Sequence, residues 1–428
     1  MRASGPDAAA LASRLFQRKA PLAAREAAYG NIVDERGTLI DRGLALLALA
    51  PHSYTGEDTI EFHVHGSPVV AAEVLRALLA CGARYAQPGE FTQRAFLHGK
   101  MDLHAAASVA DLIDAEHRSA ARAALANMGG ALANEVRSLR SRLAVLLEEL
   151  AASIDYPDEV PEPDRDAMRA QLQPIIASLE RLLHDGEIGA LMRDGVHVTI
   201  VGPPNAGKSS LLNALLGQER ALVSHLAGTT RDTIEESIVI DGLRVRLTDT
   251  AGLRHGADEL EAAGIERTHR ALAGSRVVVV VLDGSRSLDA GAEDILEQTS
   301  SRERIVFFNK SDLGDAGFRA AQIAGSIHGT VRDHDTLERI RQAIAHRALG
   351  GDVPDLQRPH LASLRETDAV ARALQSLHEA AQTITDGMPT DLIAPDLQEA
   401  LAQLGQLTGE SVTEELLTGI FSRFCIGK

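Results

Sequence analysis

The sequence GPPNAGKS at residues 202–209 is the clearest indication of fold in this chain of 428 residues. It matches the phosphate-binding pattern G-x-x-x-x-G-K-[ST], with an apolar run before it at residues 197–201 and a helix-like run after it at residues 210–216. Glycines let backbone N–H groups close around phosphate oxygens at the start of a helix. We therefore predict a P-loop in which Lys208 reaches the β- and γ-phosphates and Ser209 binds Mg²⁺.

Strand and helix patterns alternate around this loop. The Asp241-Gly242 pair reads as a hairpin turn between two neighbouring strands. Such alternation is typical of a mostly parallel sheet with helices on both faces, and it extends over residues 194–350. The strands that we expect are 196–201, 234–240, 243–248, 277–282 and 305–308.

The motif NKSD at residues 309–312 directly follows the last of these strands. The carboxylate of Asp312 can accept from both N1–H and the 2-amino group of guanine, whereas adenine offers neither donor. Asn309 can bond the opposite edge of the base, and the stem of Lys310 can lie over the ring. Together with the P-loop, this motif predicts a site for GTP rather than ATP.

Two stretches between these motifs predict the Mg²⁺ shell and the switch. DTAG at residues 249–252 supplies a carboxylate and a glycine that senses the γ-phosphate, and GTTRD at residues 228–232 supplies Thr230 to complete the shell. Taken alone, the second stretch also fits a plain surface turn. Leu253 stands where Ras-type enzymes carry a glutamine that orients water, so either hydrolysis is very slow or another group, among Asp258, Glu259 and Glu261, makes that contact.

The rest of the chain predicts two further domains. Residues 1–98 mix helix and strand patterns, with helices expected at 8–16 and 68–79 and a strand at 60–64. A long Ala/Leu-rich helical pattern covers residues 103–150, a proline-rich acidic break follows at 155–163, and a helix is expected over 165–184. We predict a multidomain α/β plus all-α protein: a small α/β domain at 1–98 and a helical domain in two parts, 99–193 and 351–428, with a Ras-like P-loop G domain at 194–350 inserted between them.

Composition excludes several classes of protein. A net charge of −17 disfavours non-specific binding to nucleic acids or anionic membranes. Cys81 and Cys425 lie far apart, in no metal-ligand spacing, and read as free thiols in a reduced compartment. Because no apolar run approaches the ~18 residues of a membrane span and the N-terminus lacks a secretion signal, we expect a cytoplasmic protein.

These motifs are similar to those of known GTPases. The P-loop, GTTRD and DTAGLR resemble those of the Era-like and TrmE-like bacterial GTPases. PGEFTQRAFL at residues 88–97, KMDL at 100–103 and YTGED at 54–58 are similar to the N-terminal domain of the MnmE (TrmE) family, and FCIGK at 424–428 is similar to its terminal signature. The resemblance covers essentially the whole chain.

The resemblance implies a function. Members of this family form homodimers and, with an FAD-dependent MnmG (GidA) partner in a heterotetramer, modify C5 of the wobble uridine (carboxymethylaminomethyl type) in certain tRNAs. The one-carbon unit comes from 5-formyl- or 5,10-methylene-tetrahydrofolate in the N-terminal domain. Cations suit the carboxylates of folate, and a glutamate can accept from pterin N–H groups. The implied folate residues, each of which would otherwise read as a surface charge, are Arg2, Glu61, Lys100 and Lys428.

The resemblance also implies a K⁺ site that replaces an arginine finger when two G domains dimerise. Its ligands would be Asn205, the carbonyls of Ser224 and Leu226, and the hydroxyl of Thr229. Glu261 matches the water-orienting carboxylate of the family, so the expected catalytic residues are Glu261, Lys208 and Gly252. The residues that we expect to contact GTP are Asn205, Ala206, Gly207, Lys208, Ser209, Ser210, Ser224, His225, Leu226, Ala227, Gly228, Thr229, Thr230, Asp249, Thr250, Ala251, Gly252, Asn309, Lys310, Asp312, Ser326, Ile327 and His328.

Two features depart from the family pattern. Its members carry a strand and a glycine-rich segment ahead of the position of Met1, which suggests a misassigned start or a truncation here; a real loss is expected to compromise the folate site and the dimerisation of the N-terminal domain. The guanine-side loop, usually Ser-Ala-Lys or Ser-Ala-Arg, reads SIH at residues 326–328. The N–H of Ile327 can still meet the guanine O6, but its larger side chain is expected to weaken nucleotide affinity.

Two alternatives remain open at this stage. A ribosome-assembly GTPase of the Era or Der type would share the G domain but carry an appended basic RNA-binding domain, whereas the C-terminal region here is helical and acidic to neutral. In the second alternative, residues 1–98 are a folate sensor or an aminomethyltransferase-like module that the G domain only regulates.

Overall fold

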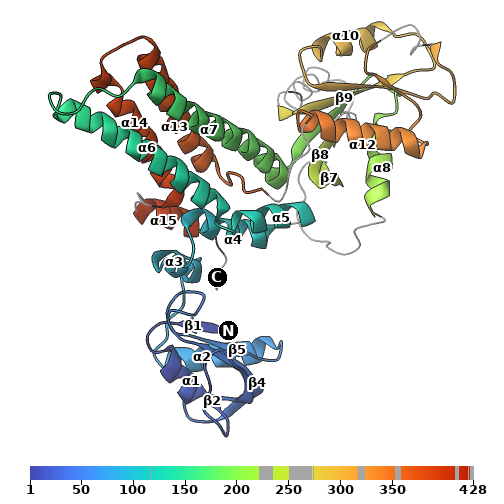
Figure 1. The fold of residues 1–428 in the computed structure, drawn as a ribbon. Helices are drawn as coiled ribbons and strands as arrows, with labels where there is room; N and C mark the ends of the chain where they lie inside the picture. Colours follow the sequence, from blue (N-terminus) through green and yellow to red (C-terminus); the bar gives the residue numbers. More distant parts are fainter. Residues whose placement is uncertain are drawn as a thin grey trace. The chain divides into compact units, whose positions relative to one another are not determined.

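The computed structural model describes residues 1–115, 117–220, 235–249, 272, 274–316, 323–351, 358–409, 414–422 and 424 (Figure 1). The chain forms two compact units. The first comprises Met1–Asp114, Ala124–Leu183 and Ala362–Lys428, and the second comprises Ala115–Ala123 and His184–Leu361. The expected domain limits of 98, 193 and 350 stay predictions, because these units combine the two outer domains and divide one long helix between them.

The N-terminal part of the first unit is built on a five-stranded antiparallel sheet in the order β1-β5-β4-β3-β2. Helices α1 and α2 pack on this sheet and share a core with it that includes Leu15, Ile32, Ile60 and Phe62. The strands are β1 (Arg2–Ser4), β2 (Phe16–Gln17), β3 (Ala27–Val33), β4 (Leu39–Ala48) and β5 (Thr59–His63), and the helices are α1 (Ala8–Leu15), α2 (Pro68–Ala80) and α3 (Glu90–Leu97).

The helical part of the first unit contains several long helices that pack side by side. Helix α14 packs against both α13 and α6. The long helical pattern over residues 103–150 corresponds to three helices, the first two ending at Asp114 and at Asn127, and the third beginning after Gly130, which has a φ of 72°. The helices are α4 (Leu103–Asp114), α5 (Arg118–Asn127), α6 (Ala131–Asp155), α7 (Arg165–Asp194), α13 (Leu364–Thr385), η1 (Thr390–Leu392), α14 (Ala394–Thr408) and α15 (Glu414–Phe421).

A buried ion pair joins α4 to α13. Nδ1 of His104 lies 3.0 Å from Oε1 of Glu366, and the two side chains are 1% and 0% exposed. The other carboxylate oxygen of Glu366 accepts from the backbone N–H of Ala362 at 2.7 Å, and Ser363 caps the helix by accepting from the N–H of Glu366. Two segments that are 262 residues apart in sequence are thus held together by a charged pair inside the helical bundle.

The second unit contains the G-domain sheet, in the order β11-β10-β9-β6-β8-β7. All strand pairs are parallel except the β7–β8 hairpin, which confirms the predicted topology. The predicted strand limits agree with the structure to within one residue. The elements are β6 (Val196–Val201), α8 (Lys208–Arg220), β7 (Glu235–Ile240), β8 (Leu243–Asp249), β9 (Val277–Asp283), α10 (Ala290–Gln298), β10 (Arg304–Asn309), β11 (Ile327–His328) and α12 (His334–Ala348).

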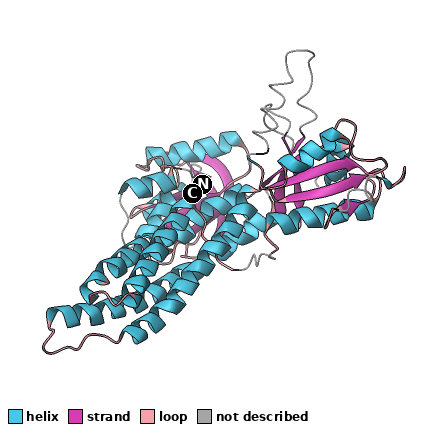
Figure 2. Ribbon diagram, turned by 90° about the horizontal axis from the view of Figure 1, so that it is seen from above, coloured by secondary structure: helices cyan, strands magenta, loops and turns pink. Residues whose placement is uncertain are grey.

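Helices cover both faces of this sheet (Figure 2). Successive residues of β9 enter opposite cores: Val277, Val279 and Val281 pack with α8 and α12, whereas Val278 and Val280 pack with α10. Burial on both faces explains why the strand is an unbroken run of apolar residues. The arrangement brings the carboxyl ends of β6, β9 and β10 to one edge of the sheet, where ligands bind in open α/β folds.

Candidate functional site

The P-loop connects the end of β6 to the start of α8. Gly207 has a φ of 103°, and a Cβ added there would collide with Nδ2 of Asn309. Gly202, with a φ of 155°, lies as closely against the carbonyl oxygen of Val281. Gly202 is therefore required by a close backbone approach, and Gly207 by the closeness of the buried Asn309 side chain together with a left-handed backbone.

Lys208 is the first residue of α8 and is buried. Its ammonium group donates to the carbonyl oxygens of Gly202 at 2.9 Å and of Pro203 at 2.8 Å, so the side chain curls back over the loop. Ser209 and Ser210 are exposed in the first turn of the helix. This places a cation, exposed hydroxyl groups and the helix N-terminus together, which is the arrangement that phosphate and its Mg²⁺ require.

Asn309 joins the P-loop to the base-recognition loop. Its side chain is buried; Nδ2 donates to the carbonyl oxygen of Ala206 at 3.0 Å, and Oδ1 accepts from the backbone N–H groups of Lys310 at 2.8 Å and Val331 at 3.2 Å. Because both lone pairs of Oδ1 are used, the amide has one remaining N–H for the edge of a base. The main contacts of Asn309 in this structure therefore connect the P-loop to the loop that carries Asp312.

Lys310 is held by an acidic residue that the sequence analysis missed. Its ammonium group lies 2.8 Å from Oδ2 of Asp283, the last residue of β9, while Ser285 donates to the other oxygen. Burial alone would raise the pKa of Asp283, but the hydrogen bonds from Lys310 and Ser285 hold it below its usual value. The available signal was the position of an acidic residue at the end of a fully buried strand beside β10.

The guanine-side residues lie around the same loop. Asp312 is partly exposed, and its Oδ2 lies 3.7 Å from the guanidinium of the exposed Arg332, a distance at which the ion pair contributes little. Ile327 pairs with Phe307 in the sheet, and its side chain is buried in the core below. Because that side chain points into the core, its size gives no steric reason for weaker nucleotide binding. Ser326 bonds to the carbonyl oxygen of Ile323 at 2.7 Å.

Several predicted site residues lie outside the described part of the chain. This group includes the switch. It also includes every expected K⁺ ligand except Asn205 and every expected catalytic residue except Lys208. Asp249 is described only as the last residue of β8. Asn205 itself is exposed at the top of the P-loop, with a φ of 62°. The undescribed predicted residues are Ser224, His225, Leu226, Ala227, Gly228, Thr229, Thr230, Thr250, Ala251, Gly252, Glu261 and Lys428.

Two of the predicted folate residues are brought together by the sheet. Arg2 and Glu61 are register partners on β1 and β5, and Nε of Arg2 lies 2.6 Å from Oε1 of Glu61. The guanidinium carbon of Arg2 lies 5.2 Å from the ring centre of Tyr54 and 5.6 Å from that of Phe91. Lys100 is exposed, and its ammonium group donates to the carbonyl oxygen of Pro51 at 2.8 Å.

The Asp312→Asn variant is expected to prefer xanthine nucleotides to guanine nucleotides. An amide at this position donates to the 2-oxo group of xanthine, while the 2-amino group of guanine loses its acceptor. With ~1–3 kcal/mol for each paired edge, the ratio of the two affinities should change by about 100-fold. Competition between GTP and XTP for the purified protein measures this ratio. The Arg332→Gln variant is the control and should change guanine affinity by less than about fivefold; unchanged selectivity in Asp312→Asn would show that another group reads the base.

Comparison with known proteins identifies the relatives of this chain. Residues 1–100 match the model of the GTP-binding protein TrmE N-terminus, and residues 103–425 match that of the MnmE helical domain. The tRNA modification GTPase MnmE of Chloroflexus aurantiacus is 41% identical over 435 residues, covering 100% of this chain and 96% of that protein. The protein of the same name from Cyanothece sp. is 39% identical, covering 100% of this chain and 95% of its own length. The chain therefore belongs to the MnmE family, as its terminal motifs and its P-loop indicated.

Proposed function

We propose that this protein is a K⁺-dependent GTPase that acts with an FAD-dependent MnmG-like partner to modify C5 of the wobble uridine in tRNA. Hydrolysis of GTP has the strongest support, because Asn309 ties the phosphate-binding loop directly to the loop that carries Asp312. The matches over the whole length of the chain support the tRNA-modifying role over a ribosome-assembly GTPase of the Era or Der type.

Each nucleotide-site residue has a defined task in this proposal. Lys208 neutralises the β- and γ-phosphates, and Asp312 selects guanine. The exposed hydroxyl of Ser209, in the first turn of α8, suits Mg²⁺, which prefers hard oxygen ligands, and Thr230 completes that shell. The amide oxygen of Asn205 is exposed at the top of the loop and suits K⁺, together with the carbonyl oxygens of Ser224 and Leu226 and the hydroxyl of Thr229.

The chemical step is the attack of water on the γ-phosphate. Glu261 is proposed to orient this water, since Leu253 cannot, and Gly252 to sense the γ-phosphate. A monovalent cation at Asn205 supplies positive charge between the phosphates, which is the contribution that an arginine finger makes in other GTPases. Because this cation site is completed when two G domains meet, the active form is a homodimer.

The N-terminal domain is proposed to bind a reduced folate. Arg2 and Glu61 form an ion pair, so their charges compensate each other. Together they present N–H donors next to a carboxylate acceptor to a ligand. A pterin edge, which carries both donors and acceptors, fits such a pair. Lys100 and Lys428 would take the carboxylates of the glutamyl end. Of these four residues, Arg2, Glu61 and Lys100 belong to the described part of the chain.

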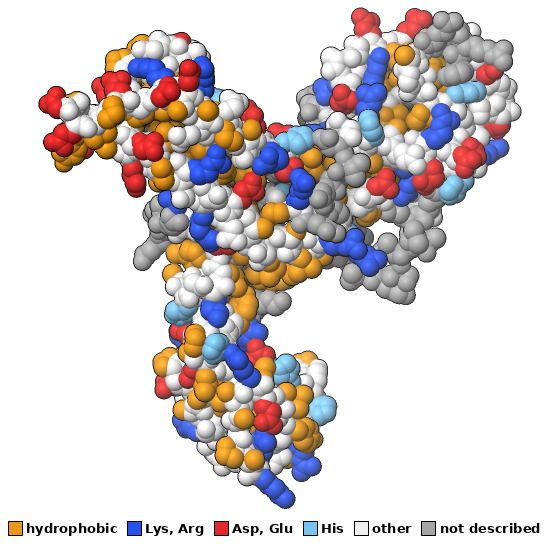
Figure 3. Space-filling model, viewed as in Figure 1, with side chains coloured by type: hydrophobic (Ala, Val, Ile, Leu, Met, Phe, Trp, Pro, Cys, Tyr) orange, Lys and Arg blue, Asp and Glu red, His pale blue; other side chains and the backbone are white. Residues whose placement is uncertain are grey.

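Surface charge is consistent with a partner-dependent role on tRNA in the cytoplasm. The net charge is −17, and on the face drawn in Figure 3 acidic and basic side chains are interspersed over the described residues. Selective binding of tRNA by such a surface would need a second protein to add contacts. Among the helices of the described ranges, none is both long and apolar enough to cross a membrane.

GTP turnover in K⁺ and in Na⁺ at matched ionic strength tests the proposal. We expect at least a tenfold faster rate in K⁺, because Na⁺ is too small to be held by ligands placed for K⁺. The Glu261→Ala variant should lose turnover while binding GTP with nearly normal affinity. Equal rates in the two salts would remove the K⁺ mechanism, and persistent turnover in Glu261→Ala would assign the water contact to another residue.

A further inference from the structure

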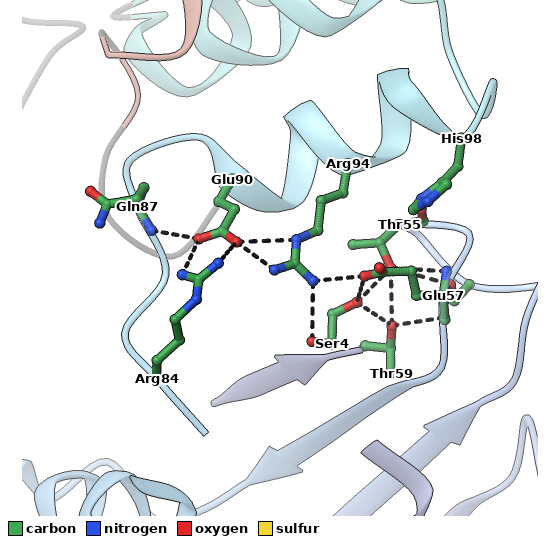
Figure 4. Close-up of polar contacts among 10 residues, drawn as sticks. Ser4, Thr55, Glu57, Thr59, Arg84, Gln87, Glu90, Arg94 and His98 are labelled. Atoms are coloured by element: carbon green, nitrogen blue, oxygen red, sulfur yellow. Dashed lines mark hydrogen bonds and ion pairs between the residues drawn. The ribbon is translucent and has the colours of Figure 1, made fainter. Parts of the chain in front are cut away.

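A network of charged side chains surrounds the start of helix α3 (Figure 4). Glu90, the first residue of the helix, is only 8% exposed. Its carboxylate accepts from the guanidinium groups of Arg84, at 2.5 and 2.8 Å, and of Arg94, and from the backbone N–H of Gln87 at 2.8 Å. The hydrogen bonds from Arg84, aided by those from Gln87 and Arg94, lower the pKa of Glu90 to about 2, so it is ionised throughout the neutral range.

Arg94 continues the network to two other segments. Its Nη1 lies 2.8 Å from Oε2 of Glu57, in the loop before β5, and 3.4 Å from the carbonyl oxygen of Ser4, at the end of β1. The hydroxyl of Ser4 donates to the same oxygen of Glu57 at 3.0 Å. Burial alone would raise the pKa of Glu57, but Arg94 and Ser4 hold it below its usual value. One guanidinium thus ties α3 to the strand and to the loop.

The segments that Arg94 joins are those that surround Arg2. Arg2 lies on β1, two residues before Ser4; Phe91 follows Glu90 on α3; and Tyr54 lies in the same loop as Glu57. The hydroxyl of Tyr54 is 2.9 Å from Oγ1 of the buried Thr92, which gives the loop a second attachment to α3. The position of both rings at the guanidinium of Arg2 therefore depends on how α3 sits against the sheet.

This arrangement fixes the direction of the Arg2 side chain. Two aromatic rings lie against its guanidinium, and its Nε is bonded to Glu61. Its terminal N–H groups have no hydrogen-bond partner among the described residues, and the side chain is 30% exposed. An arginine restrained in this way loses little rotamer entropy when it binds a ligand, and this preorganisation raises affinity.

We infer that Arg94 and Glu57 are positioning residues for the ligand of Arg2, which, on the function proposed above, is a reduced folate. They do not touch the ligand. They hold α3, and with it Phe91 and Tyr54, so that Arg2 presents its terminal N–H groups in one orientation. The inference rests on the proposed folate binding, but it names residues that resemblance to the family did not suggest.

Titration of the full chain with 5-formyl-tetrahydrofolate by calorimetry tests this inference. We expect the Arg94→Gln and Glu57→Gln variants each to bind at least about tenfold more weakly than the wild type, and the double variant to be little worse than either one, because they share one contact. Arg94→Lys keeps the charge near Glu57 and should recover part of the affinity. The matched control is Arg76→Gln, which breaks the exposed Arg76–Glu73 pair on α2 and should bind as the wild type does.

A double-mutant cycle with Arg2→Ala separates positioning from a general loss of structure. If Arg94 acts through Arg2, Arg94→Gln should lower affinity in the wild type but have no further effect in Arg2→Ala. GTP turnover, which belongs to the other unit, should be unchanged in Arg94→Gln. Equal losses in both backgrounds, or normal binding by Arg94→Gln, would overturn the inference. Failure of the wild type to bind any folate would instead refute the proposed folate function, and the inference with it.

Discussion

The Gly207→Ala variant should bind GTP and GDP at least about 100-fold more weakly than the wild type. The added methyl group would overlap Nδ2 of Asn309, and the φ of 103° is one that alanine rarely adopts. Backbone strain of ~1–3 kcal/mol adds to ~1–3 kcal/mol for the hydrogen bond from Asn309 to Ala206 if that amide is pushed away. Because each 1.4 kcal/mol is about a factor of ten, the middle of the summed range, ~4 kcal/mol, corresponds to about three orders of magnitude in affinity.

Titration with a fluorescent guanine nucleotide measures this loss. Gly217→Ala is the matched control: Gly217 lies in α8, the helix that follows the same loop, and a Cβ there would meet no atom within 4 Å. It should bind nucleotide normally and, since alanine favours a helix by about 1 kcal/mol over glycine, be slightly more stable. If Gly207→Ala bound nucleotide as well as Gly217→Ala, then the contact with Asn309 would not be the reason for a glycine at position 207.

The Glu366→Gln variant is expected to lose about 3–5 kcal/mol of stability in the helical part of the protein. Removing one charge of a buried pair leaves His104 without its partner inside an apolar bundle, and the desolvation of that group is no longer offset. Calorimetric unfolding of the full chain should show a lower transition temperature for this unit. On the same helix, Asp368→Asn breaks the exposed Asp368–Arg372 pair and should change stability by no more than about 0.5 kcal/mol.

The effect of Glu366→Gln should depend on pH. Burial alone would raise the pKa of Glu366, but His104 and the N–H of Ala362 hold it at about 2, below the ordinary 4.5. This contribution to stability is therefore present above pH 4.5 and is lost as pH falls toward 2. Burial alone would lower the pKa of His104, but Glu366 raises it above 6.5, so its contribution is present below pH 6.5 and is lost as pH rises through the raised value.

The difference in stability between the wild type and Glu366→Gln should consequently be largest between pH 4.5 and 6.5. Unfolding temperatures of the two proteins at several pH values would measure it. A gap that did not change with pH would mean that the His104–Glu366 contact is not an ion pair in the folded protein.

Much of the G domain was predictable from sequence because its strands are buried on both faces. In runs such as Val277–Leu282 every residue is apolar because both faces of the strand are buried. The limits of such strands were therefore predicted to within one residue. Most strands of the N-terminal sheet were not predicted. Strand β2 has only two residues, and β3 and β4 are interrupted by Gly30 and by the polar residues around Gly43. Without periodicity there was no local signal to detect.

In the candidate site too, some residues could be predicted from sequence and others could not. The P-loop and the base motif are contiguous in sequence, so Lys208, Asn309 and Asp312 could be named from it. Contacts between distant segments could not: Arg94 meets Glu57 across 37 residues and Ser4 across 90. Asp283 was overlooked because an acidic residue at the end of a strand has many possible roles until its partner, Lys310, is in place.

The chain passes between the units at four places, and the two that bound residues 184–361 are neighbours. Gly186, near the start of this segment, lies so close to Leu361, at its end, that a Cβ on the glycine would be 3.0 Å from that side chain. The residues between them form a closed loop whose ends already meet, so joining these ends with a few residues would add little loop-closure entropy to the folding of the helical domain. A segment whose ends meet in this way can be lengthened, exchanged or removed at the cost of shortening the end of α7, while the rest of the helical part is kept.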